Sequence, residues 1–247
     1  DRNSWDTRQS MFYRMRHNGL RRKNKPWPGA SDAHFPLSDT VIQRLAPFYF
    51  QQMFATDLIA QFTPIRDKTT AYANAAAQWF DYQLKQKSNI ETEILSVIDF
   101  MLMSGRAVIK TYWDHDKKRL VFQNIDPQHI IVPTWTRNLE DADRIVHVQH
   151  YSEEAYRRNE LFSQDEGLIK RIKGAGTDVR GDNIKVQAQY QREGLTYNEE
   201  DYIIVWEVWC RDEDGSWYCE TFSPLRPDED VRKSYKLGKG YGNKHPF

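Results

Sequence analysis

The hydrophobic pattern of the chain changes at Gly105, and this change constrains the fold more than any other feature. Before Gly105, apolar residues recur at intervals of three and four, which is the spacing of amphipathic helices. After it come runs rich in β-branched and aromatic residues, separated by charged turns, a pattern typical of antiparallel strands. Helices followed by strands predict an α+β fold and not a doubly wound parallel sheet. We expect a helical N-terminal part over residues 1–105 and a β-rich part over residues 106–247, which together form one structural unit.

Four segments of the N-terminal part have helical spacing, namely residues 4–18, 37–54, 67–87 and 90–103. Ser38 or Asp39 is the predicted N-cap of the second helix. Pro47 is expected to kink or split that helix, because proline lacks the backbone donor that a helix interior needs. Gly105 is the predicted C-terminal stop of the fourth helix. Residues 19–36 contain a Pro-Trp-Pro-Gly run and are predicted to form an extended loop.

Two hairpins are predicted in the β-rich part, one pairing residues 107–113 with 120–125 and the other pairing 202–211 with 217–222. The second hairpin is expected to turn at Asp214 and Gly215. Two further strands, over residues 130–132 and 144–151, and a short helix that begins at Ser152 complete the expected elements. Residues 173–193 are polar and contain several glycines, which favours a surface loop.

The composition narrows the class of protein. The chain has 247 residues, 39% of them hydrophobic and 13% aromatic, which is enough for a buried core. The mean hydropathy is −0.80 and the chain has no long apolar run, so we do not expect an integral membrane protein. Lys and Arg number 35 and so do Asp and Glu, and this balance disfavours a protein that holds nucleic acid by bulk positive charge. The chain begins with Asp1 and not with Met, so we expect it to be part of a longer protein.

Two cysteines, Cys210 and Cys219, flank the second predicted hairpin turn. They could face each other across the hairpin, but we favour two free buried thiols. Two cysteines are too few for a disulfide framework or a four-cysteine zinc site. This usage favours an intracellular, reducing setting.

Candidate catalytic and metal-binding residues are few. His147 and His150, with Asp143 upstream, are the best metal candidates. Residues three apart on a strand point to opposite faces, so the two imidazoles cannot reach one ion, and we favour polar histidines on a half-exposed strand. The chain has no phosphate-binding loop and no nucleophile elbow. We therefore predict no catalytic residues, no metal and no cofactor.

One basic patch stands out in the predicted loop. It consists of Arg21, Arg22, Lys23 and Lys25, with the aromatic Trp27 beside it. Four cations next to an aromatic ring can engage phosphates and stack on a base, which makes this a candidate nucleic-acid or partner patch. A solvated loop is the alternative that we favour.

Several short phrases occur in a distinctive order along most of the chain: Trp27-Pro28-Gly29-Ala30-Ser31-Asp32, Phe35-Pro36-Leu37, Ser104-Gly105-Arg106-Ala107-Val108-Ile109-Lys110, Ile125-Asp126-Pro127-Gln128-His129-Ile130-Ile131-Val132-Pro133 and His245-Pro246-Phe247. In this order the chain resembles the portal proteins of tailed bacteriophages, especially those of short-tailed phages. The collective order carries the resemblance, because each phrase alone is degenerate.

The resemblance implies a subunit of a homo-oligomeric ring, usually a dodecamer, at one vertex of the virion capsid and assembled in the host cytoplasm. Such a ring is the conduit for DNA packaging and ejection, with DNA passing through its channel. It is also where terminase, capsid, scaffold and head–tail connector proteins dock. The segment would form the peripheral wing, and no DNA-contacting residue is carried over to it.

The leading hypothesis is therefore a structural, non-enzymatic portal subunit that works without a membrane. A second hypothesis is another phage head–tail adaptor or a scaffold-interacting module. A third is a metal-dependent hydrolase that uses His147, His150 and Asp143.

Overall fold

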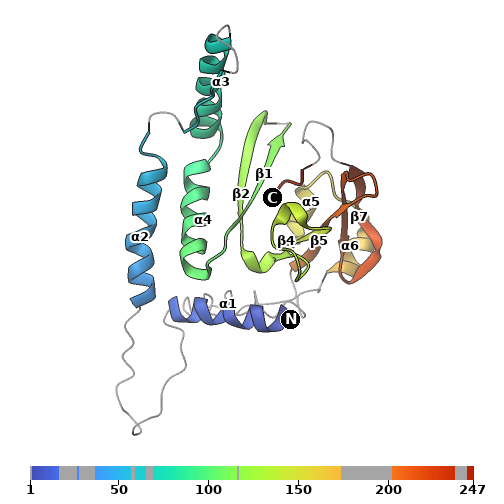
Figure 1. The fold of residues 1–247 in the computed structure, drawn as a ribbon. Helices are drawn as coiled ribbons and strands as arrows, with labels where there is room; N and C mark the ends of the chain where they lie inside the picture. The colour runs from blue at the N-terminus through green and yellow to red at the C-terminus, as the bar shows by residue number, and fades with distance from the viewer. Residues whose placement is uncertain are drawn as a thin grey trace. The chain divides into compact units, whose positions relative to one another are not determined.

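The computed structural model describes residues 2–16, 27, 37–56, 59–64, 69–115, 117–173, 202–236 and 244–247. Its helices and antiparallel sheets form an α+β fold, as the sequence predicts (Figure 1). The chain divides into two compact units. The sheet unit comprises Asp1–Met11 and Gln128–His245, and the helical unit comprises Phe12–Pro127 and Pro246–Phe247. The division into a helical part, residues 1–105, and a β-rich part, residues 106–247, stays a prediction from the sequence pattern.

The helical unit is built from four helical elements and one hairpin. Its elements are the end of α1 (Arg2–Arg16), α2 (Leu37–Met53), α3 (Thr70–Tyr82) with the π-helical turn η2 (Gln83–Lys87), α4 (Ile90–Ser104), β1 (Val108–Asp114) and β2 (Arg119–Ile125). Helix α2 packs along α4, and α4 packs along β2 (Figure 1). Glu93 of α4 joins these layers, because its carboxylate accepts the backbone N–H of Asn124 in β2 at 2.7 Å. The first predicted hairpin is thus confirmed.

The start of α2 differs from the prediction, and one of the two effects expected of Pro47, a split of the helix, does not occur. The helix begins at Leu37, so Ser38 and Asp39 lie in its first turn and are not its N-cap. Pro47 does not split the helix, which continues to Met53. Pro47 is exposed, while Ala46 beside it is buried, so packing against α4 stabilises the helix across the proline.

The end of α4 agrees with the prediction. Gly105 has a left-handed conformation, with φ 74°, and its N–H donates to the carbonyl of Met101 at 2.8 Å. This is the C-terminal conformation that glycine adopts without a Cβ penalty. The third predicted helix is α-helical over Thr70–Tyr82 and then widens into a π-helical turn.

The sheet unit is a five-stranded antiparallel sheet in the order β3-β4-β5-β6-β7. Its strands are β3 (Ile130–Ile131), β4 (Arg144–Ser152), β5 (Tyr202–Arg211), β6 (Trp217–Ser223) and β7 (Arg226–Lys236). Helices α5 (Glu153–Arg158) and α6 (Glu166–Ile172) pack on one face of this sheet. The core between them contains Tyr156, Phe162, Leu168, Ile169, Ile172, Ile203, Val205 and Val231.

The second hairpin and its turn are confirmed by the pairing of β5 with β6, and Gly215 has a positive φ of 78°. The sequence pattern does not predict two of the elements, strand β7 and helix α6. Strand β7 is an edge strand of which only Val231 is buried, so its sequence shows little hydrophobic alternation. Helix α6 has seven residues, too few for a clear helical period. Both are formed by packing on the sheet and not by local pattern.

Neither cysteine is in a disulfide, as predicted. Cys219 lies opposite Trp209 and Cys210 opposite Tyr218, so the two thiols occupy adjacent strands but point to opposite faces. Cys219 is buried, whereas Cys210 is only half-buried. Burial raises the pKa of the Cys210 thiol.

Within the described ranges, no helix combines the length and the apolar character that a membrane span requires.

Candidate interaction surface

Helix α3 is mostly exposed, although it carries hardly any charge. Ala77 is its only buried residue. No charged residue occurs from Thr69 to Phe80, in a chain of which 28% is charged. Tyr72, Trp79 and Tyr82 are 77%, 52% and 49% exposed. An exposed helix normally has a charged face, so this composition is typical of a surface that a partner covers.

The described contacts of α3 lie mostly on one side of the helix, and on the other side Lys87 Nζ lies 5.9 Å from the centroid of the Tyr82 ring. The ring of Phe62 packs edge-to-face against Phe80, with centroids 5.8 Å apart. The carboxylate of Asp81 accepts the backbone N–H of Ile59 at 3.1 Å and pairs with Lys85. The Ile59 N–H, with Lys85 as a lesser cause, holds the pKa of Asp81 below its ordinary value.

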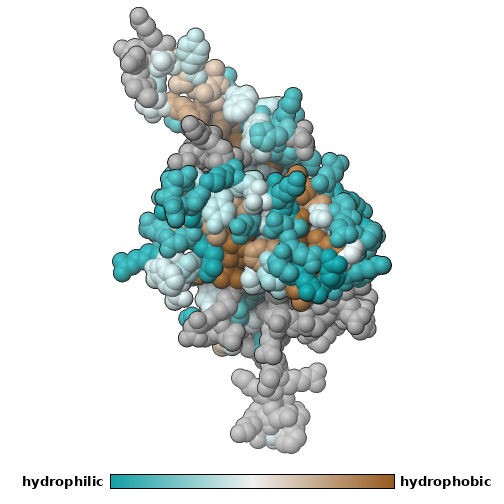
Figure 2. Space-filling model, turned by 90° about the vertical axis from the view of Figure 1, so that its right-hand side faces the viewer, coloured by the Kyte–Doolittle hydropathy of each residue, from teal (hydrophilic) through white to brown (hydrophobic). Residues whose placement is uncertain are grey.

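The open side of α3 is a mixture of small and aromatic residues. Ala75 lies two residues from the buried Ala77, which places it on the opposite side of the helix. Ala71, Trp79 and Tyr82 follow the same side at helical spacing and are all exposed. We call the residues Ala71, Tyr72, Ala75, Trp79 and Tyr82 the α3 face. Figure 2 shows mostly pale and tan residues at the top of the view, where α3 lies.

Helix α2 has a second exposed apolar surface. Leu37, Val41, Leu45 and Phe48 are 63%, 47%, 38% and 53% exposed and recur at intervals of four, four and three residues. Ile42 and Ala46, which are buried, belong to the side that packs on α4. We call the four exposed residues the α2 stripe. Helix α2 is thus apolar on two sides, and α4 covers only one of them.

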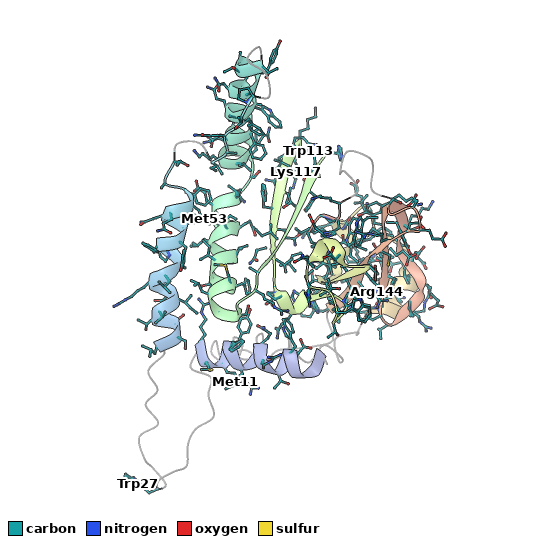
Figure 3. The ribbon with its side chains drawn as sticks, in the orientation of Figure 1. Met11, Trp27, Met53, Trp113, Lys117 and Arg144 are labelled. Atoms are coloured by element: carbon teal, nitrogen blue, oxygen red, sulfur yellow. The ribbon has the colours of Figure 1, made fainter. Side chains whose placement is uncertain are left out.

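The predicted basic patch is described only in part. Arg21, Arg22, Lys23 and Lys25 lie outside the described residues, so their role remains a prediction. Trp27 is described and is 63% exposed (Figure 3).

The histidines of β4 occupy separate environments, on opposite faces of the strand as predicted. His147 is only 3% exposed, so it lies on a buried side of the strand that was expected to be half-exposed. Its Nδ1 lies 3.3 Å from Glu207 Oε2 and 2.9 Å from Gln149 Nε2. The ring of His150 instead packs near His129, at a centroid distance of 5.1 Å. In the part of the chain that the structure describes, no three His, Cys, Asp or Glu side chains are grouped to hold a metal ion.

The buried carboxylate of Glu207 is the centre of a polar network that the sequence did not reveal. Trp209 Nε1–H donates to Glu207 Oε1 at 2.9 Å, and Gln149 Nε2–H donates to Oε2 at 2.7 Å. Tyr151 extends the network by donating to Gln149 Oε1 at 2.7 Å. Alternate residues of β4 and β5 share one face, which brings these groups together. Its satisfied hydrogen bonds indicate a structural role.

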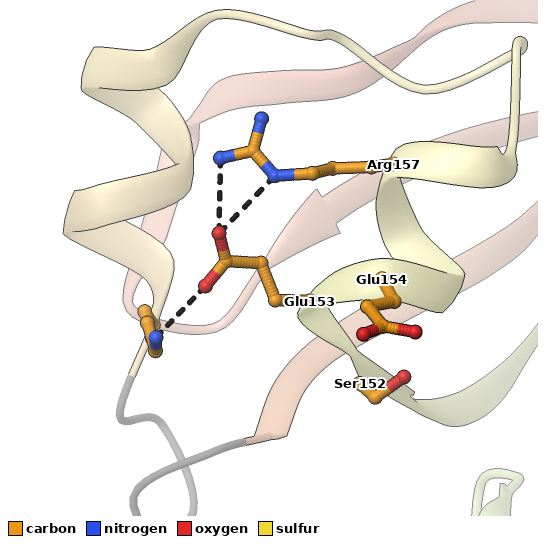
Figure 4. A pocket seen from close by; sticks show the side chains of 5 residues that line it. Ser152, Glu153, Glu154 and Arg157 are labelled. Atoms are coloured by element: carbon orange, nitrogen blue, oxygen red, sulfur yellow. Dashed lines mark hydrogen bonds and ion pairs between the residues drawn. The ribbon is translucent and has the colours of Figure 1, made fainter.

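A shallow depression lies beside the start of α5 and is lined by ionic groups (Figure 4). Glu153 pairs with Arg157 at 3.0 Å and with Lys173 at 2.8 Å. Lys173, followed by Arg157, lowers the pKa of Glu153. Ser152 Oγ accepts the Ala155 N–H at 3.2 Å and caps α5, as predicted. The charges neutralise one another, so the depression is a stabilised helix terminus.

Comparison of the chain with protein-family models and with curated proteins gave no match. The candidate surface is therefore inferred from the residues of this chain alone. One sequence signal could have revealed it, namely the uncharged run from Thr69 to Phe80. Its alanines and Trp79 instead resemble the buried face of an amphipathic helix.

Proposed function

We propose that this chain is a structural, non-enzymatic subunit of a bacteriophage portal ring at a capsid vertex. In this function, the ring is the conduit for DNA during packaging and ejection. It is also the docking point for terminase and head–tail connector proteins. Ring closure requires each subunit to present two surfaces that bind unlike surfaces on its neighbours.

The observation that carries the proposal is the exposed, uncharged α3 face, together with the ordered phrases of the sequence. A surface with Tyr72 and Trp79 in water is unfavourable for an isolated chain and favourable in an assembly. The α2 stripe is a second surface of this kind in the same unit.

The charge balance supports a structural subunit that surrounds the path of the DNA over a protein that binds DNA tightly. The 35 basic and 35 acidic residues cancel, and several of the described carboxylates are paired within the fold, as Glu153 and Asp81 are. DNA must slide through the channel of such a ring. A large excess of basic residues would hold the DNA by electrostatic attraction, so it is not needed here.

Particle imaging of the purified full-length protein tests the proposal. We expect rings with a central hole. Monodisperse monomers at high protein concentration contradict a portal ring and favour a head–tail adaptor or a scaffold-interacting module.

The basic patch has its own test. Reversal of charge at Arg21, Arg22, Lys23 and Lys25 should reduce ring assembly or genome packaging if the patch binds a partner. Unchanged assembly and packaging identify the segment as a solvated loop.

A further inference from the structure

We infer that the α3 face of one copy of the chain binds the α2 stripe of a second copy. This inference rests on the proposed function, because it names the surfaces that join neighbouring subunits.

The two surfaces are complementary in size. The α3 face has two small side chains, Ala71 and Ala75, beside the larger rings of Tyr72, Trp79 and Tyr82. The α2 stripe has the large side chains of Val41, Leu45 and Phe48. Helices pack closely when large side chains on one meet small ones on the other. The large residues of the α2 stripe can lie over the alanines of the α3 face, whereas two α2 stripes would place large residues against each other, so the unlike pairing fits better.

The area is also sufficient. The seven exposed large residues of the two surfaces each leave roughly 70–200 Å² in water, and the apolar part of the total is on the order of 800 Å². A standard interface buries ~1,600 Å², of which a little over half is apolar. The two surfaces together thus supply about the apolar share of one stable contact.

The charge pattern favours a protein partner over a lipid surface. Helices that lie on membranes have a basic polar face beside their apolar face. Thr69–Phe80 has no lysine or arginine, so α3 lacks such a face.

The two surfaces belong to different helices, and α3 makes no extensive contact with α2 in the same chain. One copy therefore keeps its α2 stripe free when its α3 face is bound. Contacts between unlike surfaces continue from copy to copy, and they close into a ring when the rotation per copy is right.

Two single variants test the contact, Ala75→Glu in the α3 face and Val41→Glu in the α2 stripe. Both positions are exposed, and glutamate is a good helix former, so the fold should be retained. We expect self-association measured by sedimentation velocity to weaken at least about 30-fold in each variant, because each buries an unpaired carboxylate. Asn74→Glu is the matched control, since it adds the same charge to α3 outside the α3 face and should associate like the wild type.

Mixing the two variants gives the decisive result. The α3 face of the Val41→Glu chain and the α2 stripe of the Ala75→Glu chain are both intact. The mixture should therefore form dimers that grow no further.

If both variants still form rings like those of the wild type, the inference is wrong but the portal function stands. A wild-type assembly that is not a ring, but is lost in both variants, contradicts the portal function and retains the contact. A monomeric wild type, or a chain that binds lipid vesicles through α3 without self-association, overturns the inference.

Discussion

Arg16 of α1 makes a bidentate ion pair with Asp99 of α4. Its Nη2 donates to Asp99 Oδ1 at 2.8 Å, and its Nη1 donates to Oδ2. Its Nε donates to Asp39 of α2 at 3.1 Å. One side chain thereby connects three helices. The hydrogen bond to Asp99 raises the pKa of Arg16 above its ordinary value, so the fold favours the charged form.

Replacement of this arginine should destabilise the helical unit. We expect Arg16→Ala to lower the free energy of unfolding by about 1–2 kcal/mol, because charge-assisted hydrogen bonds are lost from a partly buried site. Arg16→Lys should be intermediate, since an ammonium group cannot make the bidentate pair. Urea unfolding measures the effect. Arg14→Ala, at an exposed position of the same helix, is the control, and equal losses in the two alanine variants would show that the pair is not stabilising.

The left-handed conformation of Gly105 predicts that alanine at this position lowers the free energy of unfolding. A Cβ at this position meets no atom within 4 Å, so the cost of Gly105→Ala is that of the left-handed φ alone. We expect a loss of about 1 kcal/mol in unfolding free energy, and a smaller loss for Gly105→Asn. The control is Gly167→Ala in α6, where φ is not left-handed and the nearest atom is the flexible Arg171 Nη1 at 3.2 Å. No loss at Gly105 would contradict the left-handed assignment.

The buried hydroxyl of Tyr156 predicts a stabilising substitution. It has no hydrogen-bond partner among the described residues. Tyr156→Phe should therefore raise the free energy of unfolding by about 1 kcal/mol at neutral pH. Tyr13→Phe is the matched control and should lower it, because Tyr13 donates its hydroxyl proton to Asp126 at 3.0 Å.

The same tyrosine predicts a pH dependence. Burial raises the pKa of Tyr156 from its ordinary value of 10.0 to about 12. As pH rises above 10.0, the unfolded chain loses the proton while the folded chain keeps it, so stability falls. We expect Tyr156→Phe to lose less stability than the wild type as the pH rises from about 9 to 11. Identical slopes for the two proteins would refute the assignment.

Removal of the Glu207 carboxylate should be costly. Glu207→Ala leaves the buried Trp209 donor and the half-buried Gln149 donor without this carboxylate, so we expect a loss of about 3 kcal/mol in unfolding free energy. Glu207→Gln keeps one acceptor oxygen and should lose less. Glu220→Ala, on the other face of the sheet in β6, should change stability by less than about 0.5 kcal/mol. Thermal or urea unfolding followed by tryptophan fluorescence measures all three variants, and a Glu207→Ala loss no larger than that of the control contradicts the network.

Elements with a strong local signal could be predicted from the sequence. Gly105 was predicted to end α4 because glycine tolerates the left-handed backbone. The hairpin that turns at Gly215 has alternating β-branched and aromatic residues, which pair in any antiparallel setting. The opposite faces of His147 and His150 follow from the two-residue period of a strand.

Elements that depend on a distant partner could not be predicted in this way. Strand β7 is polar and forms because β6 offers it an open edge. His147 is buried because Glu207, sixty residues away in the chain, lies opposite it. The basic patch from Arg21 to Lys25 remains a sequence prediction, whereas the α3 face emerged only from the structure.

The amino-acid sequence by itself determined the order of helices and hairpins, because period, caps and turn residues act over a few neighbouring positions. Only the tertiary structure decided which apolar residues are buried. Ala75 and Trp79 have the same helical spacing as a core face, yet they lie in water, because burial depends on what packs against a helix and not on its own pattern.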